Sequence, residues 1–356
     1  MKPNKINPNI LLALLTGILL AISFISVIIG PVKISFMQIL YIIMNKVGFL
    51  DNNGHFTLIQ QSVLWEIRIP RIVLGIMVGL ALASSGAILQ GLFRNPLVDP
   101  GFIGVSSGAA VGAMIGIMFL SPLLILLPFL KYLDSFILPI LAVIGAFTTT
   151  MIIYKMSKIS KKTNIMAMLL AGIAINALAG SIIGLFVSIS SDSELRSFTF
   201  WTLGGLDNAN WKVSIISSIL ILISFLIIYN IRKQLDVFML GDAEAHHLGI
   251  NVEFLKKKVI LIASTMVGIS VSFCGMIGFI GLVTPHIIRL FIGPKHKYLI
   301  PGSALLGAIL LIFSDLISKT IIAPAQLPVG VITSIIGAPF FIWLIFSQKR
   351  RFGYSE

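Results

Sequence analysis

The chain has 356 residues, of which 57% are hydrophobic and only 11% are charged, and its formal net charge is +13. A soluble domain carries about 25% charged residues, so this composition excludes a water-soluble globular protein. Nucleic-acid binding needs a basic patch on a soluble face, and no segment of this chain is long enough to form such a domain. The composition predicts a protein that is surrounded by membrane lipid.

Long apolar runs divide the sequence into predicted membrane spans. A helix needs roughly 20 apolar residues to cross the hydrocarbon core, and continuous runs of that length favour helices over a closed barrel. The predicted spans are at about 9–30, 70–93, 102–120, 136–155, 164–189, 211–231, 256–274, 279–292, 300–322 and 329–347. The fold class is therefore all-α, polytopic, with about ten transmembrane helices in a single domain 1–356, of which the eighth is short.

Basic residues and the first apolar run set the predicted orientation. With the N-terminus in the cytoplasm, about two thirds of the 26 lysines and arginines fall in cytoplasmic segments, as the positive-inside rule requires. The run from Ile10 to Ile29 is about twice as long as the core of a signal peptide, so it is predicted to stay as the first helix. Both termini are therefore predicted to be cytoplasmic.

Small residues predict close helix contacts and a weak repeat. Glycines recur four apart on one face of the third span, which lets a neighbouring backbone approach; they are Gly104, Gly108, Gly112 and Gly116. A second set recurs at one constant offset in the opposite direction, and it favours a weak inverted-topology repeat. This set pairs Val78-Gly79, Gly86 and Pro96 with Val267-Gly268, Gly275 and Pro285.

A polar loop, 94–101, follows the second span and holds Pro96 and Pro100. Proline fixes φ and forbids a continuing helix, so this loop is predicted to be a rigid gate or seat.

Near the end of the ninth span, Asp315 is the clear embedded acid, and Lys319 lies one turn later. Embedded charges are functional candidates, but an i,i+4 pair can neutralise Asp315, so a structural pair is favoured over a proton relay.

The segment 235–250 is predicted to carry a short cytoplasmic helix between Gly241 and Gly249. Asp242 can cap its first amides, and Gly249 can end it in the left-handed conformation. A helix of one or two turns is too short to persist alone. It is therefore predicted to dock in a groove on a partner, with a solvated linker as the alternative.

The chain lacks four common motifs of ATP-binding, metal-binding and catalytic proteins. It contains no G-x-x-x-x-G-K-[ST] loop, no H-E-x-x-H pair, no cysteine cluster and no G-x-S-x-G turn. No catalytic residue, metal site or cofactor is predicted. Because only one acid is embedded, the energy for any transport is expected to come from another polypeptide.

Several short motifs resemble the permease subunits of bacterial ABC importers for iron complexes, haem and cobalamin, the FecCD-type family. The resemblance runs from about residue 65 to 347 and covers these segments in order: Arg68-Ile-Pro-Arg71, Ser85-Gly-Ala with Leu89-Gln-Gly91, Arg94-Asn-Pro-Leu97, Asp99-Pro-Gly101, Gly104-Val-Ser-Ser-Gly108, Leu240-Gly-Asp242, Leu248-Gly249, Gly278-Phe-Ile-Gly-Leu-Val-Thr-Pro-His286, Leu327-Pro-Val-Gly330 and Gly337-Ala-Pro-Phe340.

The resemblance implies an importer of ferric siderophore, haem or cobalamin in the bacterial inner membrane. It implies a second permease subunit, most simply in a homodimer, together with two cytoplasmic ATPase subunits and an extracytoplasmic substrate-binding protein. The segment that would couple to the ATPase comprises Gly241, Asp242, Ala243, Glu244, Ala245, His246, His247, Leu248 and Gly249. His246 departs from the family pattern, which usually has a basic residue there, so the resemblance implies no fixed salt bridge to the ATPase at this position.

The resemblance also implies roles for two other sets of residues. Asn95 and Leu97, with Asn164 and Ile165, match a cytoplasmic gate. Arg68, Arg71 and Lys319 match outer cations that contact acidic residues of the binding protein, although basic side chains at a membrane edge also reach for lipid head groups. Two other classes stay open from the residues alone. An ion- or proton-coupled secondary transporter would need more embedded charges, and a membrane-embedded enzyme would need a catalytic cluster.

Overall fold

The computed structural model describes residues 6–49, 54–126, 134–160, 162–323 and 325–351. Its α-helices are α1 (Pro8–Ile28), α2 (Phe36–Val47), α3 (Leu58–Ser62), α4 (Ile69–Leu92), α5 (Val105–Leu126), α6 (Asp134–Met156), α7 (Ile165–Ile189), α8 (Asp192–Leu203), α9 (Trp211–Asn230), α10 (Arg232–Phe238), α11 (Asp242–His247), α12 (Val252–Cys274), α13 (Ile280–Ile292), α14 (His296–Ser318) and α15 (Val329–Arg351). A π-helical turn, Val63–Arg68, leads into α4, and a 3-10 turn, Pro100–Ile103, leads into α5. Two short strands, β1 (Lys158–Ile159) and β2 (Lys162–Thr163), pair antiparallel.

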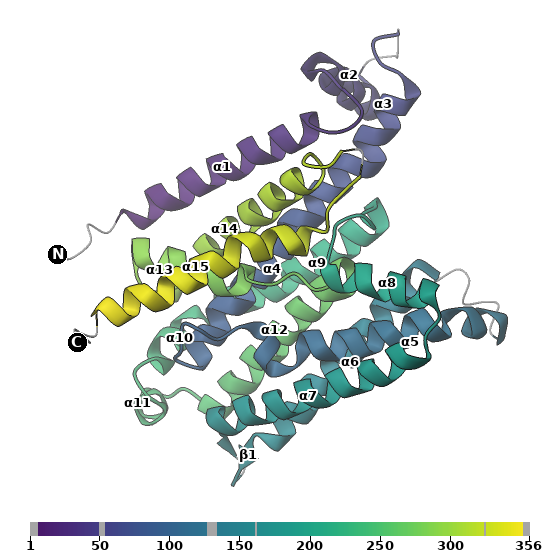
Figure 1. The fold of residues 1–356 in the computed structure, drawn as a ribbon. Coiled ribbons are helices and arrows are strands. Elements are labelled where there is room, and N and C mark those ends of the chain that lie inside the picture. The colour runs from purple at the N-terminus through teal and green to yellow at the C-terminus, as the bar shows by residue number, and fades with distance from the viewer. Residues whose placement is uncertain (1–5, 50–53, 127–133, 161, 324, 352–356) are drawn as a thin grey trace.

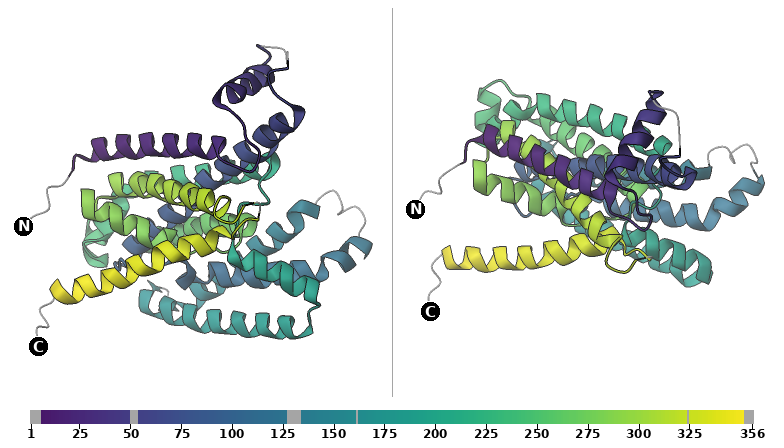
Figure 2. Two further views of the ribbon diagram at one scale, coloured as in Figure 1. Left: turned by 45° about the horizontal axis from the view of Figure 1, so that its top comes forward. Right: turned by 90° about the horizontal axis from the view of Figure 1, so that it is seen from above.

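The long helices form one bundle whose connecting segments gather at two ends (Figures 1 and 2). One end carries α2, α3 and α8 and is called the α8 end. The opposite end carries α10, α11 and the β1–β2 hairpin and is called the α11 end. Helix α1 begins, and α15 finishes, at the α11 end (Figure 1). Helix α4 lies deepest, with 78% of its most apolar window buried.

The predicted all-α membrane fold is confirmed. Among the described residues, eight helices are long and apolar enough to cross a membrane. They coincide with eight of the predicted spans, and α5, which has 22 residues, overlaps the predicted third span. The number of apolar helices in the bundle therefore lies between eight and ten.

The predicted eighth span is only α13, which has 13 residues. At 1.5 Å per residue it covers about 20 Å, whereas the hydrocarbon core is about 30 Å thick. Helix α13 begins directly after Phe279, whose backbone is left-handed with φ +68°, and it packs inside the bundle against α4 and α14. It therefore does not cross the membrane by its own length.

Local polar residues start the long helices. Asn164, Asn210 and Asn251 each accept a hydrogen bond from the amide three residues later, at the starts of α7, α9 and α12. Ser35 and Ser191 form capping boxes at α2 and α8. Each cap satisfies amides that have no partner inside the helix, so sequence fixes where these helices begin.

Glycines bring α4 and α14 into backbone contact. A Cβ on Gly79 would lie 2.5 Å from the carbonyl oxygen of Gly307, and a Cβ on Gly307 would lie 2.4 Å from the carbonyl oxygen of Gly79. The predicted glycine face of the third span is confirmed where Gly108 and Gly112 meet the α6 backbone. Small residues thus place α4 and α5 within the bundle as predicted.

We expect Gly79→Ala to destabilise the bundle by roughly 1–3 kcal/mol, because the added methyl group must push two helix backbones apart. Gly17→Ala is the matched control, since a Cβ at Gly17 on α1 meets no atom within 4 Å and gains the same helix propensity. Thermal unfolding of the two purified variants in detergent measures the difference. A melting temperature for Gly79→Ala at or above that of Gly17→Ala would contradict the close contact.

Candidate functional site

Helix α11 forms a small exposed projection at the α11 end. Of its six residues, only Ala245 is buried. Gly249 follows with φ +81°, so the predicted left-handed end of the helix is confirmed. A groove of about 1140 Å³ lies between α11, the start of α12 and the segment that enters α7. The predicted short helix between two glycines is therefore present, with most of its surface free.

The predicted capping role of Asp242 is wrong. Gly241 occupies the cap position, and no side chain caps α11. The Asp242 carboxylate turns instead to two cations: Arg94 Nη2 lies 2.6 Å from Oδ1, and Lys256 Nζ lies 2.8 Å from Oδ2. Arg94 also donates to the Phe238 carbonyl at 2.8 Å, and its guanidinium lies 4.4 Å from the centre of the Phe238 ring. Tertiary ion pairs have replaced the local cap.

A second chain of contacts joins Lys256 to the segment that enters α7. The Lys256 ammonium, whose side chain is 5% exposed, donates to Glu253 Oε1 at 3.3 Å and to the Thr163 carbonyl at 3.1 Å. Glu253 Oε2 accepts from both the backbone N–H and the hydroxyl of Thr163, each at 2.8 Å. Asn164 follows immediately and caps α7 by accepting from the Ala167 amide at 2.9 Å.

The predicted gate residues lie on two segments at this same end. Asn95 and Leu97 are in the loop after α4, where Asn95 Oδ1 accepts from the Leu97 amide at 2.9 Å. Asn164 and Ile165 stand at the start of α7. Arg94, which binds Asp242, directly precedes Asn95. Thr163, which binds Lys256, directly precedes Asn164. The structure thus connects both predicted gate segments to α11.

The Asp242 carboxylate is held in its charged form. Partial burial acts to raise its pKa, but the hydrogen bonds from Lys256 and Arg94 outweigh burial and leave the pKa below the ordinary value. On α10, burial likewise acts to raise the pKa of Asp236, and its hydrogen bonds from the His296 side chain and amide lower it overall. Both carboxylates are therefore charged hydrogen-bond acceptors at neutral pH.

At the opposite, α8 end, Arg71 and Asp315 form a buried ion pair. Arg71 Nε donates to Asp315 Oδ1 at 2.8 Å, and Nη2 lies 2.7 Å from the same oxygen. Arg71 Nη1 also reaches Asp207 at 3.0 Å and Gln326 at 2.9 Å. Lys319, the predicted partner of Asp315, is 4.0 Å away. The structural pairing of Asp315 holds, but its principal partner is Arg71 from α4, a residue 244 positions distant.

Arg68 and Lys319 bind the last turn of α1. Arg68 Nη1 donates to the carbonyls of Val27 at 2.6 Å and Ile28 at 3.0 Å, and its Nη2 donates to Val32. Lys319 Nζ donates to the carbonyl and hydroxyl of Ser26 at 2.9 and 2.8 Å. Cations are favourable at a helix C-terminus. All three predicted docking cations are buried, so each side chain already has partners in its own chain, and the docking role stays a prediction.

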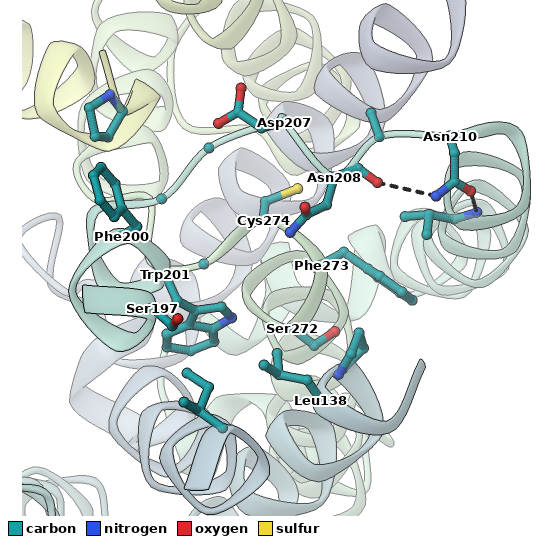
Figure 3. A pocket seen from close by; sticks show the side chains of 18 of the residues that line it. Leu138, Ser197, Phe200, Trp201, Asp207, Asn208, Asn210, Ser272, Phe273 and Cys274 are labelled. Carbon is teal, nitrogen blue, oxygen red and sulfur yellow. Dashed lines mark hydrogen bonds between the residues drawn. The ribbon is translucent and has the colours of Figure 1, made fainter. Parts of the chain in front are cut away.

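A cavity of about 760 Å³ opens beside α8. Figure 3 shows Trp201 and Phe200 from α8, Phe273 and Cys274 from the end of α12, and Asn208 from the loop into α9 around it. Asn210 donates to the Asn208 carbonyl at 3.3 Å, which holds that loop in place. The cavity combines aromatic walls with amide groups, and the sequence interpretation assigned no role to it.

Sequence reasoning missed the partners of these side chains. Asp207 and Gln326 lie in connecting segments that are far from Arg71 in the sequence, and no local sequence pattern identifies them as its partners. Lys256 did carry a signal: it falls on the buried side of α12 with Val252 and Val259, because residues three and four apart share a helix face.

Comparisons with known proteins agree with this geometry. The hemin transport system permease protein of Yersinia pestis is 41% identical over 98% of both chains. The vitamin B12 import system permease protein of Citrobacter koseri is 36% identical over 81% of this chain and 84% of its own. The solved structure of a metal-chelate type ABC transporter in an inward-facing conformation superposes with a TM-score of 0.81, at 29% identity, over 96% of this chain and 100% of the other.

The model of the FecCD transport family matches residues 18–347, a range that includes nearly all of the helices from α1 to α15. The chain carries no catalytic site of its own, as is usual for permease subunits. We conclude that this multi-pass membrane protein belongs to the FecCD transport family and is a permease subunit of a bacterial, binding-protein-dependent ABC importer.

Proposed function

We propose that this permease imports haem, with ferric siderophores and cobalamin as the related alternatives. The similarity to the hemin permease extends over 98% of both chains, whereas the similarity to a vitamin B12 permease covers 81% of this chain. These cargoes are all large metal chelates, so one kind of path between helices suits them. Haem is the first cargo to test.

The proposed assembly has two copies of this chain, two ATPase subunits at the α11 end and a substrate-binding protein at the α8 end. The single observation that carries it is the exposed α11, a short helix whose free surface lies at one end and whose Asp242 binds Arg94 and Lys256. Arg94 directly precedes Asn95, and Lys256 in turn binds the Thr163 carbonyl before Asn164. With the α11 end in the cytoplasm, both termini are cytoplasmic and ten segments cross or enter the membrane. The weak inverted repeat belongs to this proposal, although Pro96 lies in a loop and Pro285 inside α13.

The proposed functional residues fall into two groups, one at the α11 end and one at the α8 end of the bundle. Gly241 to Gly249 would dock on the ATPase as an amphipathic helix in a groove, and Asn95, Leu97, Asn164 and Ile165 would close the path on the cytoplasmic side. The proposed docking of the binding protein on Arg68, Arg71 and Lys319 requires acidic partner residues to reach cations that are now buried. The exposed Asp207 carboxylate beside Arg71, with 60% of its side chain accessible, would have to yield to the incoming acid.

Reconstitution in proteoliposomes tests the function. The purified chain alone should hydrolyse no ATP, and the chain with its ATPase and binding protein should take up hemin only when ATP is enclosed. Adding a protonophore should leave uptake unchanged. ATP hydrolysis by this chain alone, or uptake that needs a proton gradient and no ATPase, would instead support an enzyme or the secondary-transporter alternative.

A further inference from the structure

One loop and two helices, α11 and α12, meet at a single carboxylate. Asp242 is the first residue of α11, and its two oxygens divide between two cations: Oδ1 binds Arg94 from the loop after α4, and Oδ2 binds Lys256 from α12. Lys256 continues to the carbonyl of Thr163. The carboxylate therefore connects α11 with the loop that holds Asn95 and with the segment that holds Asn164.

The contacts on each side are multiple. Arg94 has a left-handed backbone with φ +49°, a conformation that a non-glycine residue keeps only when its surroundings hold it. Here its guanidinium is bound by Asp242 and by the carbonyl and ring of Phe238. At the segment that enters α7, Glu253 accepts two hydrogen bonds from Thr163 and forms an ion pair with Lys256.

We propose that Asp242, Arg94, Lys256 and Glu253 are positioning residues that transmit displacement of α11 to both gate segments at once. This inference rests on the proposed roles of α11 and of the gate residues. Because charge-assisted hydrogen bonds are short and directional, a shift of α11 moves Arg94 and Lys256 with it. Arg94 then shifts the Asn95–Leu97 loop, and Lys256 with Glu253 shifts the start of α7. Both gate segments would therefore respond together to a shift of α11.

The chain by itself permits the first test. Hydrogen exchange is measured on peptides covering 94–98 and 162–166 in detergent-solubilised wild type, Asp242→Asn and Lys256→Gln. Asp242→Asn should speed exchange in both peptides about tenfold, since it weakens two charge-assisted hydrogen bonds. Lys257→Gln is the matched control for Lys256→Gln, because Lys257 is the exposed neighbour of Lys256 on α12 and its replacement removes the same positive charge. Exchange in Asp242→Asn equal to that in wild type would overturn the proposal.

The assembled importer permits the second test. With ATPase and binding protein present, Asp242→Asn should lower the cargo uptake per ATP hydrolysed about tenfold. Asp242→Glu, which keeps the charge, should restore most of that ratio. A merely structural role would lower assembly or hydrolysis and leave uptake per ATP unchanged, and that outcome would also overturn the proposal. Failure of wild-type uptake would count against the proposed function instead, because the exchange result does not depend on it.

Discussion

Arg71→Met should destabilise this protein by about 3–5 kcal/mol, because it leaves the Asp315 carboxylate buried without its principal partner. The Asp315 side chain is 0% exposed, and Arg71 supplies both of its shortest contacts. The remaining cation, Lys319, lies 4.0 Å away and is already bound to Ser26. Loss of melting temperature and of monodisperse yield in detergent measures the effect.

The double variant Arg71→Met with Asp315→Leu is the control for the single variant Arg71→Met. Replacing both members of a buried ion pair by apolar residues is often neutral or stabilising, so it should recover most of the lost stability. If the single and double variants melt at the same temperature, the ion pair is not what the single change disrupts. A stable Arg71→Met variant would show that Lys319 or water neutralises Asp315.

Replacing residues 243–248 by an equally long glycine–serine segment should abolish transport while the bundle stays folded. Only Ala245 of α11 is buried, so the bundle loses little packing, whereas a partner loses the whole helical surface. Co-purification with the ATPase and ATP-dependent uptake should both fall at least about tenfold, the loss that 1.4 kcal/mol of docking energy represents.

A replacement of three exposed residues of α8, Leu195-Arg196-Ser197, by glycine and serine controls for general loosening, because α8 lies at the opposite end of the bundle (Figure 1). It should leave binding of the ATPase unchanged. Wild-type uptake by the α11 variant would refute the assignment of α11 as the coupling helix.

Local sequence was sufficient for the helices and for α11. Apolar runs place the spans, asparagine and serine caps place their starts, and Gly249 places the end of α11. Contacts between distant segments could not be predicted, because nothing near Arg71 indicates Asp207, Asp315 or Gln326. The capping prediction for Asp242 shows the same limit: a local propensity of about 1 kcal/mol is outweighed by two ion pairs that only the fold assembles.

The eighth span shows a different limit. The apolar run at 279–292 has the composition of a crossing helix but not its length. Its entry at Phe279 needs a left-handed backbone that bulky residues rarely adopt. The Phe279 side chain lies against Gly337 of α15, a contact between distant segments that composition alone does not predict.

The binding of α1 by Arg68 and Lys319 has a consequence for biosynthesis. Helix α1 is made first, but Lys319 is synthesised 293 residues after Ser26, the residue it binds. Only 22% of the most apolar window of α1 is buried, so the nascent helix can wait in lipid as an independent span. Its last turn gains its full set of partners only once α14 has left the ribosome and entered the bilayer. Chains that terminate before α14 should therefore retain α1 as a loosely attached helix, and firm attachment of α1 should follow the synthesis of α14 and Lys319.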